Sequence, residues 1–304
     1  MAEKYEFIQN SIKIDNRTLY QIRALKDFDS VKKGDLGGFI ESEKNLSHEE
    51  NCWVSENAHV YDNVQVYGNA RVFGDAYVYG DAKVSGNTQV YGNAEVYGNA
   101  QVFGDARVYE NTLVSENAKI SGYTWIFGNA QVFGNAQVYG NARVCENAWV
   151  YGNAQVSANA WIFEKARVYG NAWVYGNARI YDNAYVYDNT HVYNNAEIFN
   201  NAKVYEDVQV YENAKVYENT RIFGNAHVYG NARVSGNVHV YGNAHVFDNA
   251  QISGDVCLGY IPINFNCDFD PYESFKKILD HKEIFPILLG IDPGLDKMIS
   301  ERLR

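Results

Sequence analysis

Apolar side chains recur at every sixth position along two thirds of this chain. Every sixth residue from Val54 to Ile252 is Val or Ile, which gives 34 such positions without an exception. The residue two places before each aliphatic is small or β-branched, beginning with Cys52 and continuing as Ala, Thr or Val. The residue after the aliphatic is Tyr or Phe in 26 of the 34 units. A register held over so many units identifies a repeat architecture.

The six-residue unit predicts a short β-strand followed by a tight corner. In the order small-X-Val-Tyr, the small residue and Val point to one side, whereas X and Tyr point to the other, which is the period of a strand. The pair that follows is most often Gly-Asn, and these residues tolerate the positive φ of a sharp corner. A strand and a corner repeated in this way must coil.

Three such units close one triangular coil, and successive coils pair as parallel strands about 4.8 Å apart. The predicted fold class is therefore an all-β solenoid, a triangular single-stranded parallel β-helix of about eleven coils over residues 54–259. Val, Ile and Ala are expected inside and the aromatic rings outside. The recurring Asn side chains are expected to hydrogen-bond along each corner, because an amide both donates and accepts.

Both ends of the chain depart from the repeat. Residues 1–53 predict an N-terminal β cap, with strands in YEFIQ, SIKI and LYQIRAL and a hairpin turn at IDNRT. The stretch GDLGG, residues 34–38, is interpreted as a turn, because it lacks the GK[ST] ending of a phosphate-binding loop. Residues 260–304 predict a helical tail that caps the rod or drives oligomerisation, with Pro271 and Pro293 at the first positions of two helices.

Charge and cysteine usage narrow the classes of function. A formal charge of −11 argues against a general binder of nucleic acids or anionic membranes. The four cysteines lie far apart and form no CxxC pair, so the sequence suggests neither a zinc site nor a disulfide framework and favours a reducing cytoplasm. No signal-peptide core opens the sequence, and no apolar run is long enough to span a membrane.

The units V-Y-G-N-A-Q, V-F-G-D-A-R and I-F-G-N-A-Q resemble the hexapeptide-repeat superfamily of left-handed parallel β-helices. The Tyr or Phe after the aliphatic and the leader at residues 34–54 are closer to the YdcK-like proteins, a group associated with acyltransferases and often carried by bacterial prophages. The resemblance implies left-handed coils, which the spacing alone does not decide. For enzymes of the superfamily it also implies trimers, sites between adjacent solenoids, a histidine base and acetyl-CoA.

Candidate catalytic residues are His227, His239 and His245, all at the outward X position. His227 and His245 are one coil apart, and His239 lies one face away at the same level. A general base needs a partner that orients it, and no loop protrudes from the repeat to supply one. The histidines are therefore open to three interpretations: a base, a shared zinc site as in the carbonic anhydrases of the superfamily, or tolerated surface residues.

A second signal appears when the outward X positions are followed from each coil to the next. One face then carries Arg107, Trp125, Arg143, Trp161 and Arg179 on successive coils. Alternating Arg and Trp at this spacing predict cation–π stacking. Such a flat aromatic and basic strip suits an anionic polymer, a sugar chain or a partner solenoid, although ladders that only stabilise the coil would show the same pattern.

The sequence leaves three hypotheses of function. The first is a non-catalytic cytoplasmic scaffold or binding protein that presents these ladders to a macromolecular partner, either a protein or an anionic polymer, with no cofactor and no membrane. Under this hypothesis the protein is a dimer or trimer that is encoded by a phage and acts on a host component. The second is a CoA-dependent acyltransferase, and the third is a polymer-forming scaffold like the right-handed bactofilins.

Overall fold

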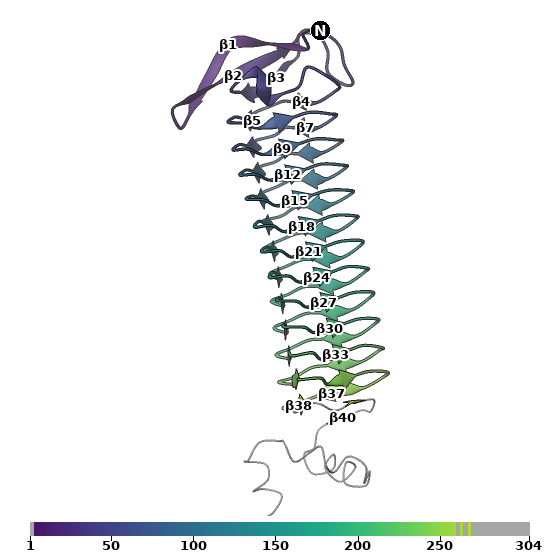
Figure 1. The fold of residues 1–304 in the computed structure, drawn as a ribbon. Helices are drawn as coiled ribbons and strands as arrows, with labels where there is room; N and C mark the ends of the chain where they lie inside the picture. Colours follow the sequence, from purple (N-terminus) through teal and green to yellow (C-terminus); the bar gives the residue numbers. More distant parts are fainter. Residues whose placement is uncertain (1–2, 260–261, 264–266, 269–304) are drawn as a thin grey trace, which may run out of the picture.

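The computed structural model describes residues 3–259, 262–263 and 267–268 of the chain. They form a long, straight rod of stacked coils with a small group of longer strands at its N-terminal end (Figure 1). Three sheets run along the rod, and within the coils every strand pairs in parallel with its counterpart on the next coil. The predicted all-β solenoid is confirmed.

The N-terminal end consists of three strands and one short helix. Their bounds are Tyr5–Ile14 for β1, Arg17–Ala24 for β2, Leu36–Ile40 for β3 and Glu43–Asn45 for the 3-10 helix η1. Strands β1 and β2 form an antiparallel hairpin, and β3 joins β2 to the first coil by pairing in parallel with β5 (His59–Val60). The two hairpin-turn residues, Asp15 and Asn16, both have positive φ, as a tight two-residue turn requires.

Two details of this end differ from the prediction. YEFIQ and SIKI belong to one strand, β1, whose register shifts between Phe7 and Ser11. GDLGG is a turn only at Gly34; its last three residues belong to β3. A Cβ on Gly38 would lie 2.7 Å from the carbonyl oxygen of Ala58, so the glycine lets β3 approach the first coil closely.

The end group covers the first coil. Trp53 is buried beneath the rings of Tyr5 and Phe28. Lys4 is also buried, and its ammonium group donates to the carbonyl oxygen of Cys52 at 2.9 Å and to the Cys52 sulfur at 3.2 Å. Burial lowers the pKa of Lys4. These contacts use hydrogen-bonding groups that an open end of the solenoid would leave exposed.

We name the three sides of the rod by their sheets. Face 1 contains β4 (Trp53–Val54), β7 (Arg71–Val72), β10 (Gln89–Val90), β13 (Arg107–Val108), β16 (Trp125–Ile126), β19 (Arg143–Val144), β22 (Trp161–Ile162), β25 (Arg179–Ile180), β28 (Glu197–Ile198), β31 (Lys215–Val216), β34 (Arg233–Val234), β37 (Gln251–Ser253) and β40 (Cys267–Asp268).

Face 2 continues from β5 with β8 (Tyr77–Val78), β11 (Glu95–Val96), β14 (Leu113–Val114), β17 (Gln131–Val132), β20 (Trp149–Val150), β23 (Arg167–Val168), β26 (Tyr185–Val186), β29 (Lys203–Val204), β32 (Arg221–Ile222), β35 (His239–Tyr241) and β38 (Cys257–Gly259). Face 3 contains β6 (Gln65–Val66), β9 (Lys83–Val84), β12 (Gln101–Val102), β15 (Lys119–Ile120), β18 (Gln137–Val138), β21 (Gln155–Val156), β24 (Trp173–Val174), β27 (His191–Val192), β30 (Gln209–Val210), β33 (His227–Val228), β36 (His245–Val246) and β39 (Pro262–Ile263).

The interior is the apolar column that the repeat predicts. All 34 aliphatic residues from Val54 to Ile252 are at most 1% exposed, and the alanines two places earlier are fully buried. Five of these small positions hold Thr instead of Ala. The hydroxyl groups remain paired, since Thr190 donates to the carbonyl oxygen of Tyr187 at 2.7 Å and Thr220 donates to that of Tyr217 at 2.8 Å.

The corners and the outer columns also follow the prediction. The residue after each aromatic has positive φ, either as Gly, for example Gly68 at 72°, or as an acidic or amide residue such as Glu110 at 62°. The next position is usually Asn, whose amide donates to its counterpart one coil on, as from Asn141 to Asn159 at 3.1 Å. Tyr and Phe rings stack along the outside of the rod. For example, the ring centroids of Tyr187 and Tyr205, one coil apart, are separated by 4.9 Å.

The solenoid extends further than predicted. Faces 1 and 3 contain thirteen and twelve strands, because β39 and β40 continue the parallel pairing beyond residue 259. The prediction of about eleven coils was therefore short by about one coil, since the chain keeps coiling where the hexad spacing ends. The predicted helices at Pro271 and Pro293 lie outside the described residues. No helix in the described part of the chain is long and apolar enough to cross a bilayer.

Candidate functional site

The outward side chains of face 1 form a ladder of alternating Arg and Trp. Arg107, Trp125, Arg143, Trp161 and Arg179 are the first residues of β13, β16, β19, β22 and β25. The parallel pairing of these strands places each of the five directly beside the next. We call this set the Arg–Trp ladder, and the alternation predicted from the sequence is present in it.

Each Trp of the ladder lies between two guanidinium groups. The guanidinium carbons of Arg107 and Arg143 are 5.4 and 5.0 Å from the ring centroid of Trp125. Those of Arg143 and Arg179 are 5.8 and 6.0 Å from the ring centroid of Trp161. An exposed cation–π contact contributes about 0.5–1 kcal/mol. The contacts therefore hold the three arginines in order along the rod.

The arginines of the ladder keep their hydrogen-bonding capacity. Within the described residues, none of Arg107, Arg143 and Arg179 makes an ion pair, and all three are exposed. Their neighbours on face 1 differ: Arg71 pairs with Asp29, and Lys215 pairs with Glu197 at 3.0 Å. Three planar donors on one face are therefore free to bind carboxylate or phosphate groups.

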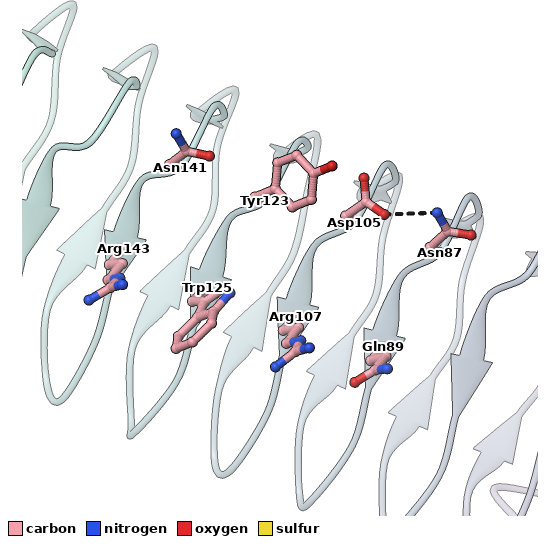
Figure 2. Close-up of a pocket in the computed structure, with 8 residues that line it drawn as sticks. All are labelled: Asn87, Gln89, Asp105, Arg107, Tyr123, Trp125, Asn141 and Arg143. Atoms are coloured by element: carbon pink, nitrogen blue, oxygen red, sulfur yellow. Dashed lines mark hydrogen bonds between the residues drawn. The ribbon is translucent and has the colours of Figure 1, made fainter.

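A shallow groove of about 500 Å³ runs beside the ladder, along the corner between faces 3 and 1. Figure 2 shows one row of corner residues and a second row of strand residues. The lining residues are Asn87, Asp105, Tyr123 and Asn141 on the corner and Gln89, Arg107, Trp125 and Arg143 on the strands. Tyr123 replaces an Asn of the corner column and is 65% exposed, so it raises one wall of the groove.

The second Trp of the ladder has a different environment. Cys145 interrupts the aromatic column of face 1 between Phe127 and Phe163, and the indole N–H of Trp161 donates to the Cys145 sulfur at 3.2 Å. Cys145 is 1% exposed, and burial raises the pKa of its thiol to about 11. A buried, protonated thiol is a poor nucleophile, so Cys145 fills space instead of supplying chemistry.

An acidic column borders the other edge of face 1, at the corner that leads to face 2. The Glu110 carboxylate accepts the backbone N–H of Gly128 at 2.7 Å, one coil on. A hydrogen bond with Asp182 raises the pKa of Glu164. The Glu110 side chain thus satisfies a backbone group of the next coil. Within the described part of the chain, no three His, Cys, Asp or Glu residues gather as a metal site would require.

The candidate histidines are brought together only in part. His227 and His245 stack with ring centroids 4.8 Å apart on face 3, whereas His239 belongs to β35 on face 2. Burial and the neighbouring His245 lower the pKa of His227, and no carboxylate contributes to that shift. The arrangement is that of a stacked surface pair, in the positions that the sequence analysis expected.

The serines in the aromatic columns are not exposed nucleophiles. Ser85, Ser115 and Ser235 are only 3–8% exposed, because neighbouring side chains close over the gap left by the missing ring. These three serine positions therefore interrupt ring stacking.

Sequence reasoning missed two features. The first is a second ladder on face 2, in which the Arg167 guanidinium carbon is 4.5 Å from the ring centroid of Trp149 and 5.5 Å from that of Tyr185. Following the X positions of face 2 from coil to coil would have found it. The second is Tyr123, whose signal was the replacement of Asn in its corner column. The spacing of residues in the sequence did not indicate that the Tyr123 ring would border a groove.

A family model described as YdcK Beta solenoid repeat matches seven stretches of the chain: residues 64–80, 100–116, 130–146, 136–152, 166–179, 178–194 and 226–242. No curated protein shows significant similarity to the chain. The matched stretches lie between residues 64 and 242 and coincide with coils of the observed solenoid. The chain is therefore a β-solenoid repeat protein of the YdcK-like family.

Proposed function

We propose that this protein is a non-catalytic binding scaffold whose Arg–Trp ladder meets a macromolecular partner. The observation that carries the proposal is the set of three exposed arginines, held in a row by Trp125 and Trp161 and free of ion pairs in the described residues. Groups held in place before binding lose little conformational entropy when a partner arrives. A structural ladder would gain more from pairing its charges within the chain.

The surroundings of the ladder support binding over catalysis. The groove beside it contains amide, phenol and guanidinium groups, but the candidate histidines lie on other faces. The proposal places the protein in the cytoplasm, and the free thiols of Cys52, Cys145 and Cys257 support a reducing compartment. It also takes the active form to be a homo-oligomer.

The test is capture of macromolecules from the native cell by immobilised protein. The ladder variant carries Arg107→Gln, Arg143→Gln and Arg179→Gln. A matched control variant carries Arg167→Gln, Lys203→Gln and Arg221→Gln on face 2, with the same change in charge. We expect the ladder variant to lose the captured partner and the control to retain it. Equal capture by both variants would refute the proposal.

The same preparations separate this function from acyl transfer. They are assayed with acetyl-CoA and amine or hydroxyl acceptors, alongside a variant with His227→Ala and His245→Ala. We expect no turnover by any of them. Acyl transfer that the histidine substitutions abolish would replace the binding proposal with the acyltransferase hypothesis.

A further inference from the structure

On face 1, acidic residues follow the Lys and Arg residues at a fixed spacing along the sequence. Three residues after Arg107, Arg143 and Arg179, the chain carries Glu110, Glu146 and Asp182. Four of the six Lys and Arg residues that begin strands of face 1 have such an acid, compared with one of five on faces 2 and 3. Elsewhere the corner position is usually Gly. The charge pattern therefore belongs to face 1 and is not a general property of the repeat.

The two charges of each coil do not pair within the chain. Arg107 and Glu110 are separated along the coil by Tyr109, whose ring stacks on Tyr91 and Phe127. In the described residues, no ion pair joins an arginine of the ladder to the acid on its own coil. Face 1 thus presents two parallel columns of opposite charge, with the aromatic column between them.

We propose that a second copy of this chain covers face 1, with the two rods parallel and related by a two-fold axis along the rod direction. At every coil, this rotation places the arginine column of each copy opposite the acidic column of the other. Arg143 of one copy then meets Glu146 of the other, and Glu146 of the first meets Arg143 of the second. The same exchange pairs Arg107 with Glu110 and Arg179 with Asp182. One patch is therefore complementary to itself, as a two-fold interface requires.

A second copy also has the right spacing. The charged coils are two coils apart, about 10 Å, and the pattern spans five coils from Arg107 to Arg179. The rod is straight (Figure 1), so an identical rod at the same level stays in register over its whole length. A polymer with another repeat length would drift out of register.

The coils between the charged ones fit the same arrangement. Opposite Trp125 the exchange places Gly128 of the other copy, which has no side chain to meet the indole. Opposite Trp161 it places Glu164, but the Trp161 side chain is turned toward Cys145 and fills the gap in the aromatic column. Rings such as Tyr109 and Tyr181 lie nearest the two-fold axis, where an interface is usually most apolar.

The area is sufficient for a stable dimer. The ten strands from β10 to β37, each with its flanking residues, cover on the order of 600 Å² per copy, because the N-terminal end group already covers Trp53 of β4 and pairs Asp29 with Arg71 of β7. Stable interfaces bury about 600–1,000 Å² per partner. The inference rests on the proposed function, because it names the partner that meets the Arg–Trp ladder.

The first test is the oligomeric state of the purified protein, measured by size-exclusion chromatography with light scattering. We expect a dimer. A reversal variant carries Arg107→Glu, Arg143→Glu and Arg179→Glu, which place acid against acid at every contact. We expect its dissociation constant to rise on the order of a hundredfold or more. A swap variant adds Glu110→Arg, Glu146→Arg and Asp182→Arg, and we expect it to dimerise again.

The matched control carries Arg167→Glu, Lys203→Glu and Arg221→Glu on face 2, and we expect it to remain a dimer. Circular dichroism melting of every variant shows that the solenoid is intact, so loss of the dimer is not loss of the fold. A partner other than a second copy would not be restored by the swap, because only a homodimer changes both sides at once. Failure of the swap to restore the dimer would overturn the inference.

The second test is the direction of the two rods. In a background with Cys257→Ser and Cys267→Ser, the single variants Arg143→Cys and Glu146→Cys are mixed and treated with a short bismaleimide crosslinker. We expect a covalent dimer that contains one copy of each variant. A mixture of Arg107→Cys and Asp182→Cys is the control, because these positions lie four coils apart in the parallel arrangement and should not crosslink. Antiparallel rods would instead bring Arg143 opposite Arg143, so a covalent dimer formed by Arg143→Cys alone and no mixed dimer would exclude parallel rods.

The outcomes separate the two proposals. A purified protein that is monomeric overturns the dimer, while capture from the native cell that still depends on the ladder leaves the proposed function in place. Capture that does not depend on the ladder overturns the proposed function. Ladder-dependent dimers in the purified protein support both.

Discussion

The two halves of the solenoid have the same interior but different surfaces. In the half that follows Ile162, long runs of aromatic rings stack, from Phe163 to Tyr217 on face 1, where Ser235 ends the run, and from Tyr175 to Phe247 on face 3. In the preceding half, four rings from Phe73 to Phe127 stack on face 1, but serines break the column of face 3 at every second coil. On face 3 the rings of Tyr67, Phe103 and Tyr139 alternate with serines and are 38–43% exposed.

The comparison shows that the aromatic position of the same repeat can hold either stacked rings or isolated, exposed rings. Where rings are continuous, each covers its neighbours and contributes to the stability of the coils. Where serines intervene, as between Tyr67 and Tyr139 on face 3, the rings stay exposed, and the groove and Tyr123 lie at the corner that follows this column.

The largest effect is expected from alkaline pH, because it acts on many stacked tyrosines at once. Burial in the stacks raises the pKa of Tyr169, Tyr181 and Tyr211 to about 12. The unfolded value is about 10, so this stabilisation is complete below pH 10 and is lost as the pH rises through about 12. Circular dichroism and tyrosinate absorbance should report unfolding in that window. A melting temperature that stays constant across it would contradict the prediction.

Truncation in the interior should affect both halves equally. Ile120 and Ile198 are fully buried, one in each half. Changing either to Ala leaves a cavity, and each change should lower the free energy of unfolding by about 2–5 kcal/mol. Urea denaturation measures both. If one substitution lowered the free energy of unfolding by more than about 5 kcal/mol and the other by less than about 2 kcal/mol, the interiors of the two halves would not be equivalent.

Removing one aromatic ring should distinguish the halves. Tyr187 stacks on Tyr169 and Tyr205 with ring centroids 4.8 and 4.9 Å away, whereas the neighbours of Tyr139 in its column are Ser121 and Ser157. Tyr187→Ser should therefore lower the free energy of unfolding by about 1–3 kcal/mol more than Tyr139→Ser. Thermal melting of the two variants gives the comparison. Equal losses would mean that stacking does not account for the stability of the second half.

Filling one gap should make the first half resemble the second. Ser121→Tyr places a ring between Phe103 and Tyr139, which would join two exposed rings into a stack. We expect a gain of about 1 kcal/mol in the free energy of unfolding. Dye-based melting curves are sufficient to detect it. A loss of stability would show that the serine is needed for packing and not only tolerated.

Much of the fold was predictable from the sequence, because the hexad spacing requires short strands and corners that coil with the aliphatics inside. The buried column from Val54 to Ile252, the Asn ladders and the Arg–Trp alternation all followed from counting residues. The N-terminal end was harder. Gly38 lies in a strand that packs against Ala58, a contact between segments that no local pattern links.

The candidate site was predictable only as a set of residues. Counting one coil onward from Arg107 places Trp125 beside it, because the coil repeats without insertions. The count does not reveal that Trp161 turns toward Cys145, since the direction of a side chain depends on the space left by its neighbours. Nor does it show which serines are buried, because burial depends on the side chains of the coils on either side.

The sequence by itself determined the solenoid, its three faces and the columns along each face, because a strict six-residue period with aliphatics on one side requires three strands per coil with the aliphatics inside. Only the tertiary structure decided how the outward side chains share the surface. Whether a ring is stacked or exposed, a thiol covered or a groove opened depends on contacts with the coils before and after it. Those contacts are set by side-chain volume and direction, which the period of the repeat leaves free.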